Sequence, residues 1–203
     1  MPKITALFCD VGGVLLTNSL GHAERGRLAE KFNLDVADFE DRHHMVSGAF
    51  DAGHLDLDGY LDRTIFYRPR NYTKGEVCAF MYSQSEALPG SLDLMARLAR
   101  SGKVFLATLN NESRDLNHHR IEKFGLRNYF SAFFSSCYLG VAKPHPQIYR
   151  LALDISQRSA DECVFIDDRP INLEGARRVG LHTIHFLNAG QLETDLRTMG
   201  VAV

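Results

Sequence analysis

From about residue 87 onward, short apolar runs alternate with helical patterns, and this alternation constrains the fold more than any other feature. Four apolar runs have the length and composition of buried strands: 104–107, 133–135, 163–166 and 182–186. Helices are predicted between them, several closed by a glycine, over residues 91–102, 112–124, 146–155 and 172–179. Such alternation predicts a doubly wound α/β fold, in which helices cover both faces of a parallel sheet.

Residues 17–86 follow a different pattern, because they contain helical segments but no convincing buried strand. The helical segments are 23–32, 36–44, 58–67 and 74–83. A further apolar run, 4–8, lies before this region and has the character of a first strand. We therefore expect residues 1–16 and 87–203 to form one α/β core domain, with residues 17–86 inserted as a helical domain.

Charge and hydrophobicity exclude several classes of partner. The 203 residues carry a formal net charge of −2, so nothing in the charge favours nucleic acid or an anionic membrane as a partner. No apolar stretch reaches membrane-spanning length, and the first residues lead directly into the predicted strand 4–8. We therefore expect a cytoplasmic location.

The stretch that follows the first predicted strand contains Asp10, Gly12 and Gly13. Asp10 lies at the carboxyl end of the strand, where open α/β sheets bind their ligands. The two glycines allow the backbone to approach a bound anion or metal closely, so we count Gly13 among the substrate contacts. This stretch predicts a ligand site that includes the Asp10 carboxylate.

A second apolar strand pattern ends in a pair of carboxylates, Asp167 and Asp168. Two adjacent carboxylates repel each other unless a cation or protons relieve the repulsion. Together with Asp10 they offer three anionic oxygen donors, which suits a hard divalent ion such as Mg²⁺. The alternative is that one of the pair simply caps the following helix.

Two further segments carry candidate phosphate ligands. Lys143 lies just before a helix whose entry is fixed by two prolines, and a fixed ammonium can neutralise a phosphate and a nucleophilic carboxylate together. Asn110 and Asn111 lie where the strand at 104–107 leads into a helix amino terminus, which is a natural anion site. The asparagines suit a plain helix cap equally well.

In this order the four segments resemble the haloacid dehalogenase-like hydrolase superfamily, whose members are mostly Mg²⁺-dependent phosphatases. The resemblance covers residues 4–16 and 88–186 and is closest at 143–149 and 165–172. The helical insertion is similar to the small cap that many members carry after the first strand. The set of segments is far more specific than any one of them.

The resemblance assigns a role to each candidate residue. Asp10 corresponds to the nucleophile, which would form an aspartyl-phosphate that water later hydrolyses. The metal ligands would be the Asp10 carboxylate, the Gly12 main-chain carbonyl and Asp168, with Asp167 acting through a water or orienting the site. Lys143 would clamp the phosphate, and Asn110 and Asn111 would contact it. Metal and lysine together would stabilise charge on the transferring phosphoryl group.

The sequence departs from the family pattern at two positions. Family phosphatases usually have an aspartate at the position of Gly12, which protonates the leaving oxygen and then activates water. Losing such a group costs about 10²- to 10⁴-fold in rate. The family's strand-end serine or threonine corresponds either to Asn110, with Asn111 following, or to Thr108, one residue early. We prefer the first register, because it keeps the following asparagine and the helix start.

The sequence therefore predicts a Mg²⁺-dependent hydrolase of a small phosphorylated metabolite, acting as a monomer or homodimer. Gly12 leaves two alternatives open. One is a metal-independent 2-haloacid dehalogenase, in which the aspartate at the position of Gly12 is also absent because halide leaves without a proton. The pair Asp167 and Asp168 argues against it, since these carboxylates make most sense with a cation. The other is a catalytically weak or non-catalytic relative that binds a phosphorylated ligand.

Overall fold

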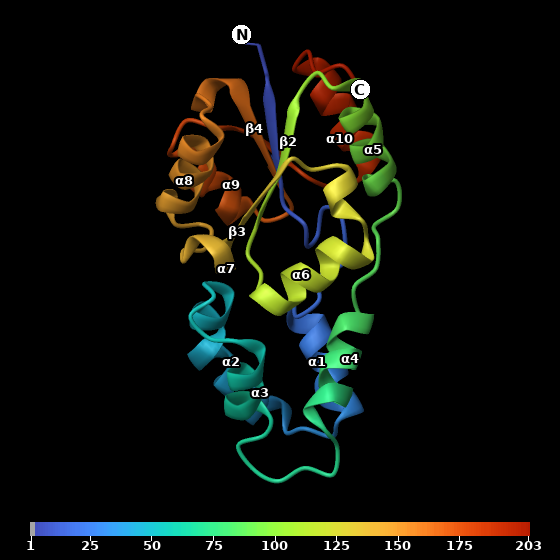
Figure 1. Cartoon of the computed structure of the whole chain (residues 1–203), viewed down its shortest axis with the longest axis vertical. Coiled ribbons are helices and arrows are strands. Elements are labelled where there is room, and N and C mark those ends of the chain that lie inside the picture. Colours follow the sequence, from blue (N-terminus) through green and yellow to red (C-terminus); the bar gives the residue numbers. More distant parts are fainter. Residues whose placement is uncertain (1–2) are drawn as a thin grey trace.

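A computed structural model describes residues 3–203 and places a five-stranded parallel sheet at the centre of the molecule (Figure 1). The strand order is β3-β2-β1-β4-β5, so the chain crosses from one side of β1 to the other after β3. The strands are β1 (Ala6–Cys9), β2 (Phe105–Asn110), β3 (Ala132–Ser135), β4 (Cys163–Asp167) and β5 (His182–His185). The predicted doubly wound α/β fold is confirmed.

Side chains of successive strand residues point to opposite faces of the sheet, and each face is buried under helices. In β1, Leu7 and Cys9 pack into one apolar cluster, and Ala6 and Phe8 pack into another. The helices of this part of the chain are α5 (Ser91–Ser101), α6 (Arg114–Lys123), α7 (Ser136–Leu139), α8 (Pro146–Ser156), α9 (Pro170–Arg177) and α10 (Ala189–Thr198). Burial on both faces explains why the strands are almost continuously apolar in sequence.

The sequence patterns did not predict α10. Its segment is mostly polar, but Leu192 and Leu196 share one side of the helix and are buried against the cluster that contains Leu7. Two leucines one turn apart are a weak pattern, so only their packing against α5 identifies the helix.

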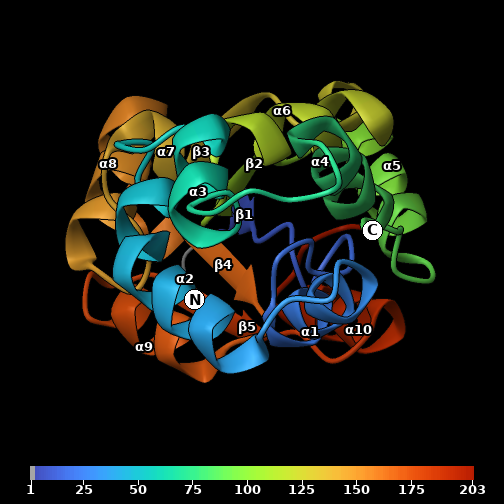
Figure 2. The ribbon, with the colours of Figure 1, turned by 90° about the horizontal axis from the view of Figure 1, so that it is seen from below.

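Four helices lie between β1 and α5 in sequence and gather at the carboxyl-terminal edge of the sheet (Figure 1). They are α1 (His22–Lys31), α2 (Val36–Asp51), α3 (Leu57–Thr64) and α4 (Lys74–Ser83). They enclose an apolar cluster that includes Leu28, Phe39 and Phe50. Seen from below, α2 and α3 lie on one side and α1 and α4 on the other, with β1 and β4 visible between them (Figure 2).

Helix α2 is longer than the sequence predicts. The pattern predicts a helix over 36–44 that ends before Gly48, because glycine in a helix interior costs about 1 kcal/mol relative to alanine. The helix instead continues through Gly48 to Asp51, and Phe50 in its last turn is fully buried in the apolar cluster that the four helices enclose. Burial of this aromatic side chain outweighs the propensity cost. The extension places Asp51 at the end of α2.

The two chain segments that connect these four helices to the sheet lie side by side. Leu16 forms an antiparallel bridge to Ala87, and the Thr17 amide donates to the Glu86 carbonyl. The Thr17 hydroxyl also accepts a hydrogen bond from the Glu86 amide. None of the helices among residues 3–203 combines the length and apolar character needed to cross a membrane.

Candidate active site

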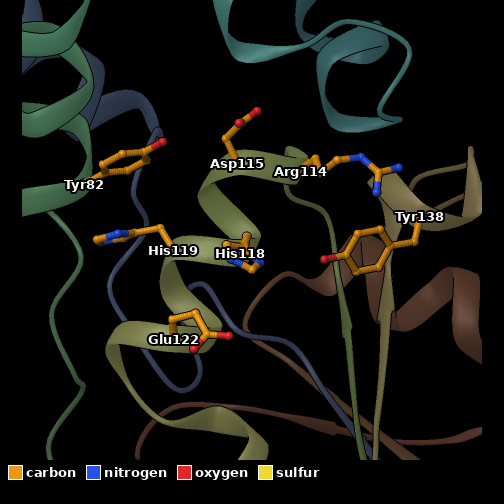
Figure 3. A pocket seen from close by; sticks show the side chains of 7 residues that line it. All are labelled: Tyr82, Arg114, Asp115, His118, His119, Glu122 and Tyr138. Carbon is orange, nitrogen blue, oxygen red and sulfur yellow. The ribbon is translucent and has the colours of Figure 1, made fainter.

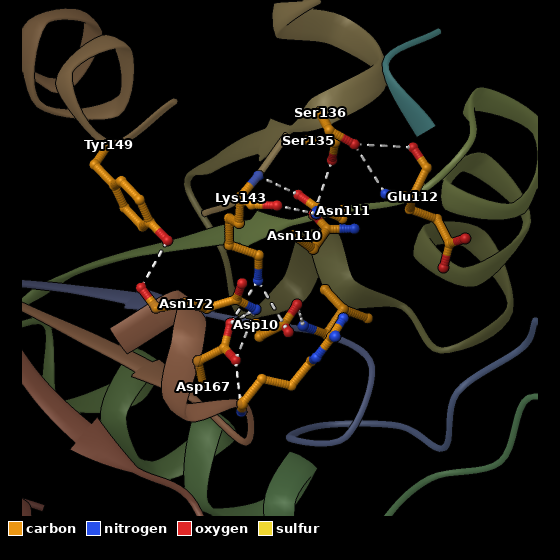
Figure 4. A network of polar contacts seen from close by, with 12 residues as sticks. Asp10, Asn110, Asn111, Glu112, Ser135, Ser136, Lys143, Tyr149, Asp167 and Asn172 are labelled. Carbon is orange, nitrogen blue, oxygen red and sulfur yellow. Dashed lines mark hydrogen bonds and ion pairs between the residues drawn. The ribbon is translucent and has the colours of Figure 1, made fainter. Parts of the chain in front are cut away.

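Lys143 lies between two aspartates at the carboxyl ends of neighbouring strands (Figure 4). Its Nζ is 2.9 Å from Oδ2 of Asp10, which follows β1, and 2.6 Å from Oδ2 of Asp167, the last residue of β4. All three side chains are buried, with Asp167 and Lys143 at 0% and 5% exposure. The structure therefore brings together three of the residues that the sequence selected.

Both carboxylate oxygens of Asp167 accept hydrogen bonds. Its Oδ1 accepts from the Arg169 amide at 2.8 Å and from Asn172 Nδ2 at 3.0 Å. Its Oδ2 accepts from Asn172 Nδ2 at 3.1 Å as well as from Lys143. Because every lone-pair direction of this carboxylate has a partner, its main effect is to hold Lys143 and the start of α9.

The charges of this cluster depend on one another. Burial alone would lower the pKa of Lys143, but the neighbouring Asp10 and Asp167 carboxylates raise that pKa above its ordinary value. Lys143 is therefore charged at neutral pH. Burial, and secondarily the negative charge of Asp167, raises the pKa of Asp10 to about 8, although Lys143 opposes this shift. The Asp10 carboxylate also accepts a hydrogen bond from the Val11 amide through Oδ1, at 2.8 Å.

Oxygen atoms of Asp10, Asp167 and Asp168 all lie within 4.8 Å of one another. Burial, followed by the charge of Asp167, raises the pKa of Asp168, as expected for carboxylates crowded together. Gly13 lies directly against this group: it has a φ of +76°, and a Cβ there would collide with the Asp168 carboxylate. The hard oxygen donors and the close backbone approach fit a divalent cation such as Mg²⁺.

The structure gives Asn111 a different contact from the phosphate contact expected from sequence. Its side-chain amide donates to the Lys143 carbonyl at 2.9 Å, and its Oδ1 accepts from the Lys143 amide at 2.8 Å. Two hydrogen bonds to one residue fix the backbone from which the Lys143 side chain extends (Figure 4). Asn111 also lines the cavity beside Asp10.

Asn110 is buried in a polar contact within the core. Its Nδ2 donates to Asn117 Oδ1 at 3.1 Å, and its Oδ1 accepts from the Ser135 hydroxyl at 2.9 Å. Thr108, the other residue considered for the strand-end position, is fully buried, and its hydroxyl has no partner among residues 3–203. Phosphate contacts by Asn110 and Asn111 stay predictions.

The space that a side chain at Gly12 would occupy already holds other groups. A Cβ there would lie 2.6 Å from Asn18 Oδ1 and 3.7 Å from Arg120 Nη1. The Arg120 guanidinium is buried, donates to Glu112 Oε2 at 2.5 Å and also contacts the Thr17 carbonyl. Gly12 therefore stands where polar side chains from two other segments fill the space.

A cavity of about 550 Å³ opens between the strand ends and the helices α1 and α2. Its core wall includes Asp10, Lys143 and Asp168, which come from the sheet side. We use "cap wall" for the residues that line the same cavity from α1, α2 and the loop before α1: Asn18, Ser19, Leu20, Gly21, His22, Arg25, His43, Ser47, Phe50 and Asp51. The cavity therefore joins two regions that are distant in sequence.

The cap wall is itself held by polar contacts. Arg25 donates to both carboxylate oxygens of Glu40, from Nε at 2.8 Å and from Nη2 at 2.7 Å. His43 Nδ1 lies 2.9 Å from the Tyr60 hydroxyl. Burial, followed by the positive charge of Arg25, lowers the pKa of His43 to about 4, so this histidine is neutral at pH 7.

A second cavity, of about 570 Å³, lies along α6 (Figure 3). The ring of Tyr82 stacks on His119 with centroids 4.3 Å apart, and Arg114 lies over the ring of Tyr138. None of the clustered aspartates lines this cavity. The oxygen cluster and the buried lysine mark the first cavity as the candidate active site.

Sequence reasoning missed Asp51, Arg25 and the buried pair of Arg120 and Glu112. None of them lies in a recognisable motif: Arg25, Arg120 and Glu112 fall in segments predicted only as helices or helix starts, and Asp51 lies beyond the helix predicted at 36–44. A charged residue on an otherwise apolar helix face is the one signal available, and Arg25 beside Leu28 and Ala29 has it.

Comparison with known proteins identifies relatives along most of the chain. The family profile described as haloacid dehalogenase-like hydrolase matches residues 4–180. Flavin mononucleotide hydrolase 1 of Arabidopsis thaliana is 32% identical over 81% of this chain and 66% of its own length. Glyceraldehyde 3-phosphate phosphatase of Pyrococcus furiosus is 27% identical over 97% of this chain and 86% of its own length.

The chain spans just under two thirds of the Arabidopsis protein, and only 22% of bifunctional epoxide hydrolase 2 of Rattus norvegicus, which is 30% identical over the matched part. Among solved structures, a HAD family enzyme of Bacteroides thetaiotaomicron superposes with a TM-score of 0.77 at 21% identity. That match covers 92% of this chain and 95% of the other chain, and it establishes the shared fold.

The fold, the strand-end aspartates and the family profile all point to the same protein family. The relatives with assigned activities include named phosphatases, among them the Pyrococcus enzyme. The chain therefore belongs to the haloacid dehalogenase-like hydrolase family.

Proposed function

We propose that this protein hydrolyses small phosphomonoesters with the help of Mg²⁺, through a phosphorylated Asp10. The observation that carries the proposal is the position of the Asp10 carboxylate. It lies in a cavity, 2.9 Å from a buried lysine, and shares an oxygen cluster with Asp167 and Asp168. A nucleophile, a fixed positive charge and a cation site are the three elements that phosphoryl transfer requires.

Each residue of the core wall has a defined part in this reaction. Oδ2 or Oδ1 of Asp10 attacks phosphorus, and the bond from phosphorus to the ester oxygen breaks. Lys143 neutralises the attacking carboxylate and then the phosphoryl oxygens, while Asp167 and Asn111 keep the lysine in place. Water then cleaves the aspartyl-phosphate and restores Asp10.

The residues that would hold Mg²⁺ are Asp10, Asp168 and the main-chain carbonyl of Gly12. Asp167 is the least available of the three clustered carboxylates, because Lys143, Arg169 and Asn172 already occupy it. When bound, the cation neutralises negative charge on the phosphate and orients it toward Asp10.

The helical region 17–86 would act as a cap domain that contributes one wall of the substrate cavity. The cavity has room for a small metabolite, and its cap wall offers hydroxyl, imidazole and guanidinium groups. We propose that the substrate is a small polar phosphate ester. A cytoplasmic location and a monomeric or homodimeric state stay predictions.

The dehalogenase alternative remains the useful contrast. Halide leaves without a proton, so a dehalogenase would not need the aspartate that Gly12 replaces. A dehalogenase of this kind also needs no metal, and so no cluster of carboxylates to bind one. The clustered oxygens of Asp10, Asp167 and Asp168 favour cation-assisted phosphate chemistry instead.

The test is phosphate release from a panel of esters that includes flavin mononucleotide, glyceraldehyde 3-phosphate and phosphoserine. Each ester is assayed with Mg²⁺ and with a chelator, and Asp10→Asn serves as the blank. We expect Mg²⁺-dependent release that Asp10→Asn abolishes. Equal rates for the two proteins would contradict a phosphatase, and chelator-resistant halide release from 2-haloacids would establish the dehalogenase.

A further inference from the structure

The proposed reaction requires a proton donor that Gly12 does not provide. When phosphorus transfers to Asp10, an alkyl ester oxygen leaves as a strong base unless it receives a proton. The water that later attacks the aspartyl-phosphate must lose one. An inference about this donor rests on the proposed function, and the candidates are the other carboxyl groups that line the cavity.

Three of the four side-chain carboxylates that line this cavity are already committed. Asp10 is the nucleophile and is paired with Lys143. Asp168 belongs to the oxygen cluster that fits a cation. Glu112 is paired with the buried Arg120 guanidinium at 2.5 Å and accepts a hydrogen bond from the Ser19 hydroxyl at 3.3 Å.

The fourth carboxyl group, on Asp51, is free of such partners. Among residues 3–203 no hydrogen bond or ion pair involves the Asp51 side chain. The hydrogen bond that Asp51 accepts from the Ser136 hydroxyl is made by its backbone carbonyl. Asp51 lines the same cavity as Asp10 but enters it from the cap wall. It is therefore the only carboxyl group of the cavity that is available to exchange a proton.

The position of Asp51 is fixed by contacts between the cap helices and the sheet. The Ser136 hydroxyl donates to the Asp51 carbonyl at 2.6 Å and accepts from the Glu112 amide at 3.0 Å, so one side chain joins three segments. Two residues later, Gly53 has a φ of +74° and lies so close to the Cys137 carbonyl that a Cβ would collide with it. The end of α2 is thus attached to the segments that follow β2 and β3.

We propose that Asp51 is the general acid and base of this enzyme, in place of the aspartate that Gly12 lacks. As Asp10 attacks phosphorus and the ester bond breaks, the protonated Asp51 carboxyl group transfers its proton to the leaving oxygen, which departs as an alcohol. The Asp51 carboxylate then takes a proton from the attacking water. The water oxygen binds phosphorus, the bond from phosphorus to Asp10 breaks, and inorganic phosphate leaves.

The groups around Asp51 favour a titration near neutral pH. Glu112 faces it from the segment after β2, Arg25 from α1 and Arg169 from the start of α9. Burial, followed by the charge of Glu112, raises the pKa of Asp51 to about 7, although the two arginines oppose the shift. A carboxyl group that exchanges its proton close to the working pH is suited to act first as acid and then as base.

The experiment compares Asp51→Asn with the wild-type chain in single-turnover assays on two substrates. Glycerol phosphate has an alkyl leaving group that needs a proton, whereas p-nitrophenyl phosphate releases a stable phenolate. We expect phosphorylation of Asp10 by glycerol phosphate to slow by about 10²- to 10⁴-fold and by p-nitrophenyl phosphate to change little. With p-nitrophenyl phosphate, phosphorylated Asp10 should accumulate, because hydrolysis has lost its base. Asp41→Asn, an exposed carboxylate of the same helix, is the matched control and should behave as wild type.

The alternatives give different results. Equal slowing on both substrates without accumulation of phosphorylated Asp10, or no slowing at all, would overturn the assignment of Asp51. If Glu112→Gln slows the reaction of glycerol phosphate but not that of p-nitrophenyl phosphate, and Asp51→Asn does not, Glu112 is the general acid. A wild-type chain no faster than Asp10→Asn would overturn the proposed function itself, and this assignment with it. Asp51→Ser is a second variant that lacks the carboxyl group and should behave like Asp51→Asn. Thermal unfolding curves for every variant show whether a loss of activity comes from misfolding.

Discussion

The two walls of the cavity are built in opposite ways. On the core wall, the Lys143 ammonium lies within 3 Å of the Asp10 carboxylate and of the Asp167 carboxylate behind it, and backbone amides and Asn111 hold these groups in place. On the cap wall, each charged group is paired with its own helices, as Arg25 is with Glu40, or has no partner, as with Asp51.

This difference indicates a division of labour. A rigid set of charges at the strand ends is suited to hold a phosphoryl group, whose geometry is the same in every substrate. Groups on the helices can differ from one family member to another without disturbing that set. Gly12 suggests that, in this chain, proton transfer has moved from the core wall to the cap wall.

Replacing Lys143 with methionine tests the core wall and should have the largest effect. We expect phosphate release to fall by about 10³-fold on every substrate, because the charge that faces the phosphate is lost. Breaking a buried ion pair should also lower the free energy of unfolding by about 3–5 kcal/mol. Steady-state rates and urea unfolding measure both effects. Lys103→Met removes an exposed lysine next to the amino-terminal end of β2 and should change neither. A loss limited to one substrate would contradict the assignment to the core wall.

Returning the missing carboxylate to the core wall should restore activity to the Asp51→Asn protein. In Gly12→Asp the exposed Asn18 side chain must turn aside, because its Oδ1 lies 2.6 Å from the new Cβ. With Asn18→Ala added to Gly12→Asp, the rate of the Asp51→Asn protein on glycerol phosphate should rise at least about 10-fold. The loss caused by Asp51→Asn alone is expected to be about 10²- to 10⁴-fold. The control is Asn18→Ala with Asp51→Asn and Gly12 unchanged. No recovery in a folded triple variant would mean that the two positions are not interchangeable.

Asn111→Ala sharpens the comparison within the core wall, because it loosens Lys143 without removing its charge. The two hydrogen bonds to the Lys143 backbone would be lost, at a cost of about 1–3 kcal/mol of stability. We expect kcat to fall by about 10-fold, since each 1.4 kcal/mol of transition-state stabilisation is tenfold in rate, with the Mg²⁺ dependence retained. Kinetics over a Mg²⁺ titration measure this effect. If KM for phosphate esters rises instead and kcat is unchanged, Asn111 contacts the substrate directly, as the sequence predicts.

The smallest predicted effect is on stability and concerns the cap wall. The folded-state pKa of Asp51 is about 7, above its ordinary value of 3.8, so its ionisation opposes folding as the pH rises from about 4 toward 7. Asp51→Asn removes this penalty. We therefore expect Tm to rise at pH 8, by about 2–4 °C for each kcal/mol of penalty removed, and to be nearly unchanged at pH 4. Calorimetry at the two pH values tests the sign, and an increase at pH 4 alone would contradict the buried, protonated carboxyl group.

Much of the core wall was predictable from local sequence. The strand at 4–8, the apolar run at 163–166 and the polar residues that end them occur in short segments, so each element and its last side chain can be identified without knowing the rest. The partners of Asn110 and Asn111 were not predictable in this way. Either residue fits a phosphate contact or a helix cap, and only packing against Ser135 and Lys143 distinguishes their contacts.

The sequence by itself determined the α/β fold and placed Asp10, Lys143, Asp167 and Asp168 at the ends of neighbouring elements. Parallel strands bring their carboxyl ends to one edge, so the aspartates that end β1 and β4 meet there, and Lys143 reaches them from the loop before α8. Only the tertiary structure decided that Asn18 and Arg120 lie beside Gly12 and that Asp51 lines the same cavity as Asp10. The position of Asp51 depends on how α2 continues past Gly48 and on how its end is attached at Ser136. Such contacts join segments far apart in sequence, and no local pattern records them.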